Sequence, residues 1–434
     1  MVFNSIRMSG KLLQFLSAIF ANIGTIVYGI AGGWPSATMP ILSSTDSPLP
    51  SGPLTTEEVS LVNSILAIGG MVGAVFFGWI SDYCGRKWPL VVAMIPQVIA
   101  FILIATAQNT MFLYISRFLS GSILGIFYNI GIIIAYIICA YMPFYSVPYV
   151  ALAIMSLFTL YTFFPESPQY LLLKCQNSAA EKSFKFFRGF SKTDQTKLEF
   201  ESLKAHVTTS NTKTNLTLED FKPASTRKAM LISYIILSGR NLSGVFPLLN
   251  YTVSIFEAAG TGFDPHISSI IVAVIQLAGT AFSAYITDKS GRRFLLISSL
   301  LLTGLCLSVM GIYFYLNHLQ YDLSSISWLP VVFLSGTFFV AAGVLNVPVY
   351  ILAELLPVKV RSSVATVFMA TAWPQTFFIV QYYAPIAESL GVYSCMWLFA
   401  GWCFFEAIFA YFLLPETKGK SAAEIVLALE GEIK

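Results

Sequence analysis

A turn that combines acidic, glycine and basic residues occurs twice in this chain, as GWISDYCGRK at Gly78–Lys87 and as AYITDKSGRR at Ala284–Arg293. Each copy follows one long apolar segment and directly precedes another. Carboxylates and guanidinium groups at the ends of membrane helices can form ion pairs that hold one face of a protein shut. A turn repeated in this way indicates two homologous membrane halves. We therefore expect a carrier in which one half rocks against the other.

The composition is typical of a membrane protein. Of the 434 residues, 56% are apolar and 11% are charged, whereas soluble globular chains carry roughly 25% charged residues. The net charge of +3 says little about partners, and we interpret the cations as determinants of orientation and not as a nucleic-acid surface. The six cysteines lack C-x-x-C or metal-ligand spacing. We expect them to be packing residues, with no metal, redox chemistry or cofactor.

Eleven apolar segments predict an all-α integral membrane protein. Most of them reach the roughly 20 residues that a helix needs to cross hydrocarbon, and continuous apolar runs exclude a barrel. The segments are residues 12–32, 58–80, 88–107, 111–142, 146–164, 229–256, 267–287, 294–316, 327–350, 363–386 and 392–414.

One long polar stretch divides the chain. It is rich in Lys, Ser and Thr, and its periodic pieces predict short surface helices and not a separate enzyme domain. We find no nucleophile–base set, metal cluster or phosphate-binding loop, so an enzyme is disfavoured. The expected parts are an N-terminal membrane half (1–164), a linker with short helices (165–228), a C-terminal membrane half (229–416) and a tail (417–434).

The positive charges predict how the chain lies in the membrane. Of the 25 lysines and arginines, all except Arg117 and Arg240 lie in or beside one set of connecting segments. The loops of the opposite set contain none. By the positive-inside rule, both termini and the linker are cytoplasmic.

This orientation creates a problem for segment 111–142, which must then begin and end on the outer side. Its 32 residues make about 48 Å of helix, short of the roughly 60 Å that two crossings need. One alternative is a single crossing, which would place the linker and its glycosylation sequon Asn215–Thr217 outside. The other is a pair of half-helices that turns back near Gly121, Gly125 and Gly131. We expect the second, because a single crossing would place eleven linker cations outside.

The two halves also differ in length. The interval from Asp82 to Pro165 is 84 residues, and the matching interval from Asp288 to Pro415 is 128 residues. The first half is therefore 44 residues shorter, and it has no counterpart of Glu354–Arg361. A missing piece explains this better than a natural design with eleven helices.

The paired turns, PESP at 165–168 and PETKGK at 415–420 resemble the sugar porters of the major facilitator superfamily. Further motifs, such as LSG at 242–244 and YTVSIF at 251–256, resemble insect facilitated trehalose transporter-like proteins in particular. The resemblance implies two six-helix halves related by a pseudo-two-fold axis, with the first half truncated. The absent stretch includes the end of helix 4 and the start of helix 5. A skipped exon, a faulty gene model or a genuine truncated isoform would each explain it.

The resemblance also implies a gate of charges at the cytoplasmic helix ends. Ion pairs there would hold that face shut and must break when it opens. The alternative is that some of these residues only anchor helices at the lipid headgroups. The gate residues would be Asp82, Arg86, Glu166, Asp288, Arg292, Glu354, Arg361 and Glu416.

Substrate-binding residues are also implied by the resemblance. Sugars need amide donors and acceptors beside an aromatic face in apolar walls, although each such residue can instead cross-link neighbouring helices. For Tyr251 packing is the favoured interpretation. The matching positions are Asn129, Arg240, Asn241, Tyr251, Gln276 and Trp373.

Arg240 departs from the family pattern, in which two glutamines stand at 240 and 241. An intramembrane arginine is costly unless it has a partner or water. Arg240 could bind an anionic or modified solute, or it could pair with Glu406 in the last apolar segment. Both alternatives stay open at the level of sequence.

The leading interpretation is a facilitative hexose or disaccharide carrier that works by alternating access, as a monomer in the plasma membrane. Proton-driven sugar porters usually carry an Asp in their first helix, and the run 26–34 has no acid. Uniport is therefore favoured. The alternative is a non-transporting sensor-like or degenerate paralogue that lacks parts of helices 4 and 5.

Overall fold

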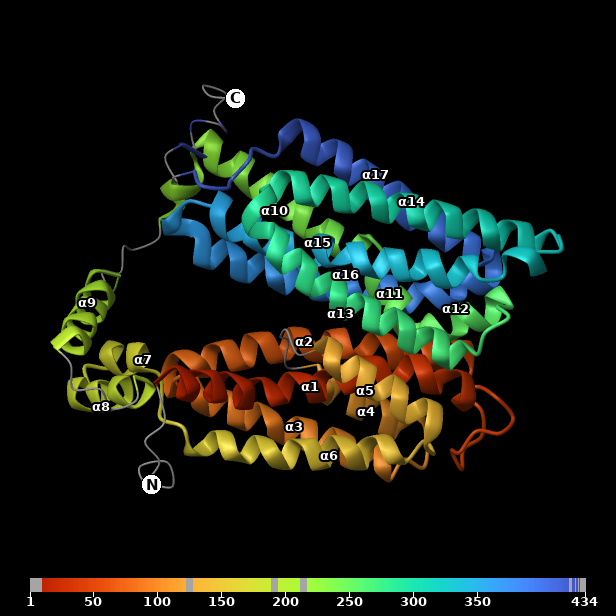
Figure 1. The fold of residues 1–434 in the computed structure, drawn as a ribbon, viewed down its shortest axis with the longest axis horizontal. Helices are drawn as coiled ribbons and strands as arrows, with labels where there is room; N and C mark the ends of the chain where they lie inside the picture. Colours follow the sequence, from red (N-terminus) through yellow and green to blue (C-terminus); the bar gives the residue numbers. More distant parts are fainter. Residues whose placement is uncertain are drawn as a thin grey trace.

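Two helical bundles lie side by side in the computed structural model (Figure 1). The structure describes residues 10–121, 128–188, 194–210, 217–420, 424, 425, 427 and 429, which form helices and turns without a strand. The sequon residue Asn215 lies outside these residues. The helices of both bundles run along the long axis of the molecule, and the segments between the bundles lie at one end of it.

The described residues of the N-terminal bundle form six α-helices. Its second helix begins with a reciprocal cap, because Glu58 N–H donates to Thr55 Oγ1 at 3.3 Å and Thr55 N–H donates to Glu58 Oε2 at 2.9 Å. The helices are α1 (Gly10–Leu42), α2 (Thr56–Cys84), α3 (Lys87–Ala105), α4 (Thr110–Ser120), α5 (Tyr128–Tyr141) and α6 (Ser146–Phe158), and a 3-10 turn, η2 (Thr159–Phe163), extends α6.

Short helices follow in the connecting stretch, as the polar sequence predicts. They are α7 (Pro168–Leu173), α8 (Asn177–Phe187), α9 (Asp194–Ser210) and the 3-10 turn η3 (Leu218–Phe221). Gln14 Nε2 of α1 donates to Phe187 O at 2.8 Å, and Lys359 Nζ donates to Asp220 Oδ1 at 2.7 Å. The stretch is thus tied to both bundles.

The C-terminal bundle has long helices, α15 (Leu329–Leu355) and α16 (Val358–Leu390), where the N-terminal bundle has the short helices α4 and α5. Its other helices are α10 (Ala224–Leu242), α11 (Val245–Asn250), α12 (Thr252–Ala259), α13 (Pro265–Ser290), α14 (Arg292–His318) and α17 (Val392–Leu413), with a 3-10 turn, η4 (Ser324–Ile326), before α15. Residues Ile425 and Leu429 of the tail are buried against this bundle, and Lys228 Nζ donates to Leu429 O at 2.9 Å.

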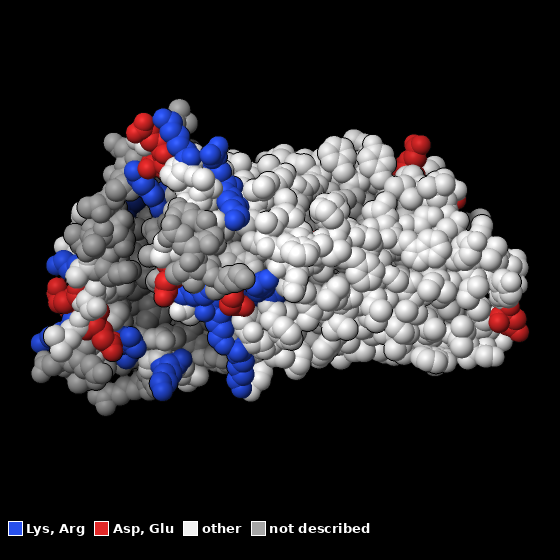
Figure 2. Space-filling view, turned by 90° about the horizontal axis from the view of Figure 1, so that it is seen from above, with Lys and Arg blue, Asp and Glu red and all other residues white. Residues whose placement is uncertain are grey.

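Charge and apolar surface separate along the long axis. Ten helices in the described part of the chain are long and apolar enough to cross a membrane. Figure 2 shows a broad uncharged surface over them, with lysines and arginines gathered at the end where the connecting segments lie. We name this end the cationic end and the other the opposite end. A multi-pass membrane protein follows from this arrangement.

Segment 111–142 is not the single span that its apolar run suggests. It contains two short helices, α4 of 11 residues and α5 of 14 residues. Thr110 Oγ1 donates to Glu58 Oε1 at 3.1 Å at the opposite end, whereas Gly121, after the last turn of α4, lies against Gly70, halfway along α2.

The helix α5 reverses this path. Tyr128 at its start lies against Gly29, halfway along α1, and Gly131 approaches the same helix so closely that no Cβ fits. Beyond its end, Tyr145 OH donates to Pro48 O at 3.1 Å in a loop of the opposite end. Both short helices thus run between the opposite end and the middle of the bundle, as the expected pair of half-helices requires. The predicted turn itself, with Gly125, lies outside the described residues.

The segment 229–256 is interrupted. Helix α10 ends at Leu242, and Gly244 adopts a left-handed conformation with φ +82°, packed against the ring of Phe399. Two short helices, α11 and α12, follow. Discontinuous helices of this kind expose backbone groups at mid-depth in carriers.

Candidate functional site

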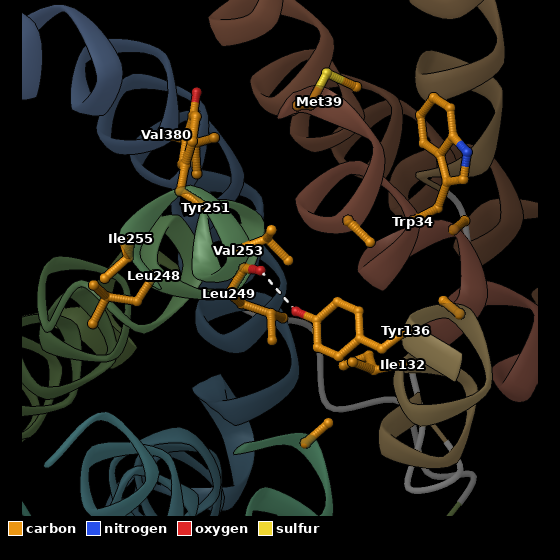
Figure 3. Close-up of a cluster of buried hydrophobic side chains, with 14 of the residues drawn as sticks. Trp34, Met39, Ile132, Tyr136, Leu248, Leu249, Tyr251, Val253, Ile255 and Val380 are labelled. Atoms are coloured by element: carbon orange, nitrogen blue, oxygen red, sulfur yellow. Dashed lines mark hydrogen bonds between the residues drawn. The ribbon is translucent and has the colours of Figure 1, made fainter. Parts of the chain in front are cut away.

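The two bundles share one hydrophobic core toward the opposite end. This core combines residues of α1 and α5, such as Trp34 and Ile132, with residues of α11 and α12, such as Leu248 and Val253. In Figure 3, Leu249 and Val253 of the C-terminal bundle lie on the side toward Tyr136 and Ile132 of the N-terminal bundle. Toward the cationic end, the C-terminal bundle has a separate core of its own, built around Ile232, Leu296 and Val360 among others.

Hydrogen bonds also join the bundles toward the opposite end. Tyr136 OH of α5 donates to Leu249 O at 3.2 Å (Figure 3). Val253 N–H of α12 donates to Ser36 Oγ of α1 at 3.2 Å. Ser64 Oγ of α2 donates to the side-chain oxygen of Gln381 in α16 at 2.5 Å. The opposite end is thus closed by packing and by buried polar contacts between halves.

At the cationic end, Glu166 binds within its own half. Its carboxylate accepts hydrogen bonds from the N–H groups of Arg86 at 3.1 Å and Lys87 at 3.2 Å, and from Ser167 N–H at 2.9 Å. The N–H groups at the start of a helix lack intrahelical acceptors, and a carboxylate there is favoured by the helix dipole. Glu166 therefore caps α3. The side chain of Arg86 is exposed.

Glu416 makes the equivalent cap in the second half. It accepts from Arg292 N–H at 3.0 Å, Arg293 N–H at 3.2 Å and Thr417 N–H at 3.0 Å. In addition, Arg292 Nη2 lies 3.1 Å from Glu354 Oε1 in an ion pair, and Thr417 Oγ1 donates to Glu354 Oε2 at 2.5 Å.

The remaining gate positions are placed as follows. Arg361 donates from Nη2 to Leu356 O at 3.0 Å and from Nε to the same oxygen at 3.2 Å. The side chains of Asp82 and Asp288 lie outside the part of the chain that the structure describes. The hydrogen bonds and the ion pair given for the gate residues thus stay inside each half.

Thr280 links two predicted amide residues, Asn129 and Gln276, where α5 packs against α13. Asn129 Nδ2 donates to Thr280 Oγ1 at 2.8 Å, and Thr280 Oγ1 donates to Gln276 O at 2.9 Å. The side-chain oxygen of Gln276 is buried without a hydrogen-bond partner. A buried acceptor without a partner is unfavourable, so a hydroxyl donor that reached this oxygen would be bound favourably.

Asn241 instead cross-links two helices of the second half. Its Nδ2 donates to Ala372 O at 3.0 Å and to Gln375 Oε1 at 3.2 Å. Gln375 Nε2 donates onward to Ser238 Oγ at 3.1 Å. A polar network therefore joins α10 to α16, and Gln375 is one of its members that the sequence analysis missed.

The two aromatic positions lie between elements. The ring of Trp373 in α16 packs on Gly70 of α2, where a Cβ would lie 2.6 Å from the indole. Tyr251, between α11 and α12, packs its ring 4.8 Å from that of Tyr383, and its hydroxyl has no hydrogen-bond partner.

Arg240 and Glu406 do not form an ion pair. Glu406 is fully buried with its carboxylate against Gly239, and neither carboxylate oxygen has a hydrogen-bond partner. The guanidinium of Arg240 lies 5.7 Å from the centre of the Phe246 ring, and its Nε has no partner. The expected alternative of an Arg240–Glu406 pair is wrong, because the Glu406 carboxylate packs against Gly239 while the Arg240 guanidinium packs on Phe246.

The family model described as "Sugar (and other) transporter" matches residues 17–131 and 126–428. The chain belongs to this family. The match is divided at residues 126–131, beside the start of α5, where the sequence predicts a missing stretch. Membership in this transporter family also confirms that the chain is a transporter and not an enzyme.

Two curated relatives of this sugar transporter are facilitated trehalose transporters. That of Polypedilum vanderplanki is 28% identical over 97% of the chain, which covers 89% of the relative. That of Drosophila virilis is 27% identical over 97% of the chain, which spans about half (49%) of the longer relative. A solved xylose transporter of E. coli in an inward open conformation aligns with a TM-score of 0.75 at 17% identity, covering 97% of this chain and 100% of that one. The major facilitator fold is thereby confirmed.

One buried residue of this sugar transporter was missed by sequence reasoning. Arg117 of α4 is 2% exposed, and its Nε donates to Val62 O at 3.0 Å while its Nη1 donates to Ala31 O. Its Nη2 lies 3.5 Å from Asn250 Oδ1 in the other half. The signal was present, since Arg117 and Arg240 are the two cations outside the cationic segments.

Proposed function

We propose that this sugar transporter moves a neutral or singly charged sugar by facilitated diffusion through alternating access. The observation that carries the proposal is the one-sided closure of the two bundles. They share a core and hydrogen bonds toward the opposite end. The gate residues at the cationic end pair inside their own halves. A carrier in this state is closed at one end. Transport requires that this end opens while the other end closes.

The cationic end is proposed to be cytoplasmic. The positive-inside rule supports this assignment, and it makes the structure an inward-facing state. Both termini and the linker (165–228) would then be cytoplasmic, between membrane halves at 1–164 and 229–416. We further propose that the protein works as a monomer in the plasma membrane, without a nucleic-acid partner.

The proposed substrate contacts come from both halves. Gln276 offers an unpartnered oxygen, and Asn129 of the other half bonds to Thr280, one helical turn from Gln276. Trp373 provides an aromatic face at the contact of α2 with α16. Asn241, Tyr251 and Arg240 complete the proposed set. Amides and an aromatic face within apolar walls suit sugar hydroxyls and the apolar face of a sugar ring.

The gate is proposed to close by exchange of partners. Arg86, Arg292 and Arg361 would meet carboxylates of the other half when the cationic ends approach, and Glu354 would remain the partner of Arg292 until then. The set also includes Glu166 and Glu416, together with Asp82 and Asp288. Rearrangement of ion pairs at an interface is a known device for switching between two packed states.

Uniport is proposed because residues 26–34 of α1 carry no acid. Arg117, the buried cation nearest this run, is bound by backbone carbonyl groups and needs no carboxylate. No titrating partner is then required for its charge to be tolerated.

Uptake of radiolabelled glucose and trehalose into proteoliposomes tests the proposal. We expect uptake that follows the sugar gradient and ignores an imposed pH gradient. Gln276→Ala should lower uptake by about 5-fold or more, since a lost hydrogen bond is worth about 1–3 kcal/mol. The matched control is the exposed Gln320→Ala in a loop of the opposite end.

The alternative, a non-transporting paralogue, predicts no uptake of either sugar by correctly folded protein. Accumulation against the sugar gradient that a protonophore abolishes would instead exclude uniport.

A further inference from the structure

The region between the bundles holds a guanidinium without a counter-ion. No carboxylate of the described residues forms an ion pair with Arg240, and its Nε has no hydrogen-bond partner. In the apolar interior of the spans, the sequence offers one carboxylate, Glu406. That carboxylate lies against Gly239 and leaves Arg240 unpaired.

Arg240 lies beside the core that the two bundles share. It belongs to α10 in the C-terminal half, and its guanidinium lies 5.7 Å from the centre of the Phe246 ring, which packs against that core. Phe246 O accepts a hydrogen bond from Asn250 Nδ2 at 2.8 Å, and Asn250 Oδ1 lies 3.5 Å from Arg117 Nη2 of the N-terminal half. Arg240 is half-buried, and its Nε is buried without a hydrogen-bond partner. Its position is therefore at the boundary that a solute must pass.

The second buried cation in this region is already satisfied. The donors of Arg117 are used by Val62 O, Ala31 O and Asn63 O. Arg117 is thus bound by backbone carbonyl groups, whereas Arg240 has no carboxylate partner among the described residues. An unpaired cation at membrane depth needs water or an anion, and the planar guanidinium binds a carboxylate through two parallel hydrogen bonds.

We infer that the transported substrate class includes sugars with one carboxylate, such as a uronate, whose anion pairs with Arg240. A carboxylate neutralises this single free charge, whereas a phosphate monoester would carry a second negative charge into the apolar path. The inference rests on the proposed function, because it names the substrate of the same pathway.

The test uses full-length protein in proteoliposomes with radiolabelled D-glucuronate, D-glucose and D-glucose 6-phosphate. We expect the wild type to take up glucuronate, and Arg240→Gln to lower glucuronate uptake about tenfold or more, and at least about threefold more than it lowers glucose uptake. Arg240→Lys keeps the charge without the two parallel donors and should lie between them. The matched control is Arg227→Gln, an exposed arginine of the same helix, which should change neither uptake.

A second readout follows from charge. An inside-negative potential set with potassium and valinomycin should slow glucuronate uptake and leave glucose uptake unchanged. Uptake of glucose but not glucuronate by the wild type would overturn the inference and leave the proposed function standing. The same conclusion follows if Arg240→Gln and Arg240→Lys lower both sugars equally, or if glucose 6-phosphate is preferred. Uptake of no sugar by any variant would overturn the proposed function as well.

Discussion

Glu166 and Glu416 occupy equivalent places in the two halves, and each accepts hydrogen bonds from the first N–H groups of the next helix. The glycine before each helix has a positive φ, +95° at Gly85 and +89° at Gly291, and the carboxylate lies directly against it. The halves differ in the arginine that follows. Arg292 is paired with Glu354, whereas Arg86 is exposed.

The difference shows what the shorter first half has lost. Glu354 comes from the end of α15, the middle region of the second half. In the first half the corresponding region holds the short helices α4 and α5, whose inner ends lie against Gly70 and Gly29 in the middle of α2 and α1. Both halves keep the glutamate cap, because it needs only the repeated turn and the glutamate at the end of the half. An ion pair like Arg292–Glu354 also needs a helix such as α15, which ends at the cationic end, and the described helices of the first half include no counterpart of it.

The largest effect is expected at Gly85 and Gly291, the glycines that precede the capped helix in each half. Gly85→Ala and Gly291→Ala each place a Cβ about as close to a carboxylate oxygen, at 2.5 Å and 2.6 Å, and force alanine into a positive φ. We expect each to lower the free energy of unfolding by about 2–4 kcal/mol, from backbone strain and crowding. Denaturation of the purified protein measures this. Gly401→Ala in α17, where a Cβ meets nothing within 4 Å, should not destabilise; equal losses at all three glycines would contradict the argument.

Removing the capping carboxylates should have a smaller effect that is again equal in the halves. Glu166→Ala and Glu416→Ala leave several N–H groups without their acceptor, and we expect a loss of about 1–3 kcal/mol in each. The same denaturation measurement applies, with the exposed Glu388→Ala as control. A loss confined to one half would show that the two caps are not equivalent.

The third prediction concerns the ion pair that only the second half shows among the described residues. Glu354→Gln removes a half-buried ion pair and should lower the free energy of unfolding by about 1 kcal/mol. Arg86→Gln should change it by less than about 0.5 kcal/mol, because a lone exposed cation contributes little. If Arg86→Gln costs as much as Glu354→Gln, the first half has a charged partner equivalent to Glu354.

The smallest effect concerns the contact of the linker with α16. The Lys359 Nζ that donates to Asp220, together with Thr217 N–H, lowers the pKa of Asp220 below its ordinary value of 3.8. A lowered carboxyl pKa stabilises the folded state above the ordinary pKa, and this contribution is lost as pH falls through the lower folded value. The melting difference between wild type and Asp220→Asn should therefore be constant from pH 8 to about pH 5 and fade below about pH 4. A difference that fades near neutral pH would point to another group.

Much of the architecture could be predicted from local sequence. Apolar length marked the spans, the repeated turn marked the two halves, and charge parity required 111–142 to turn back. Apolar length and the repeated turn can be recognised within a few tens of residues, and the charge argument needs only a count of the crossings. The interruption of α10 at Gly244 was missed, because an isolated glycine in an apolar run does not by itself end a helix.

The candidate site was less predictable. The sequence by itself determined which residue types lie at membrane depth: the amides at 129, 241 and 276, and the lone cation at 240. Only the tertiary structure decided their partners. Asn241 is bound by Gln375, 134 residues away, while Gln276 keeps a free oxygen and Arg240 has no carboxylate. Composition sets the depth of a side chain, but the rotation of each helix about its axis sets its direction, and that rotation is fixed by packing against helices far away in the chain.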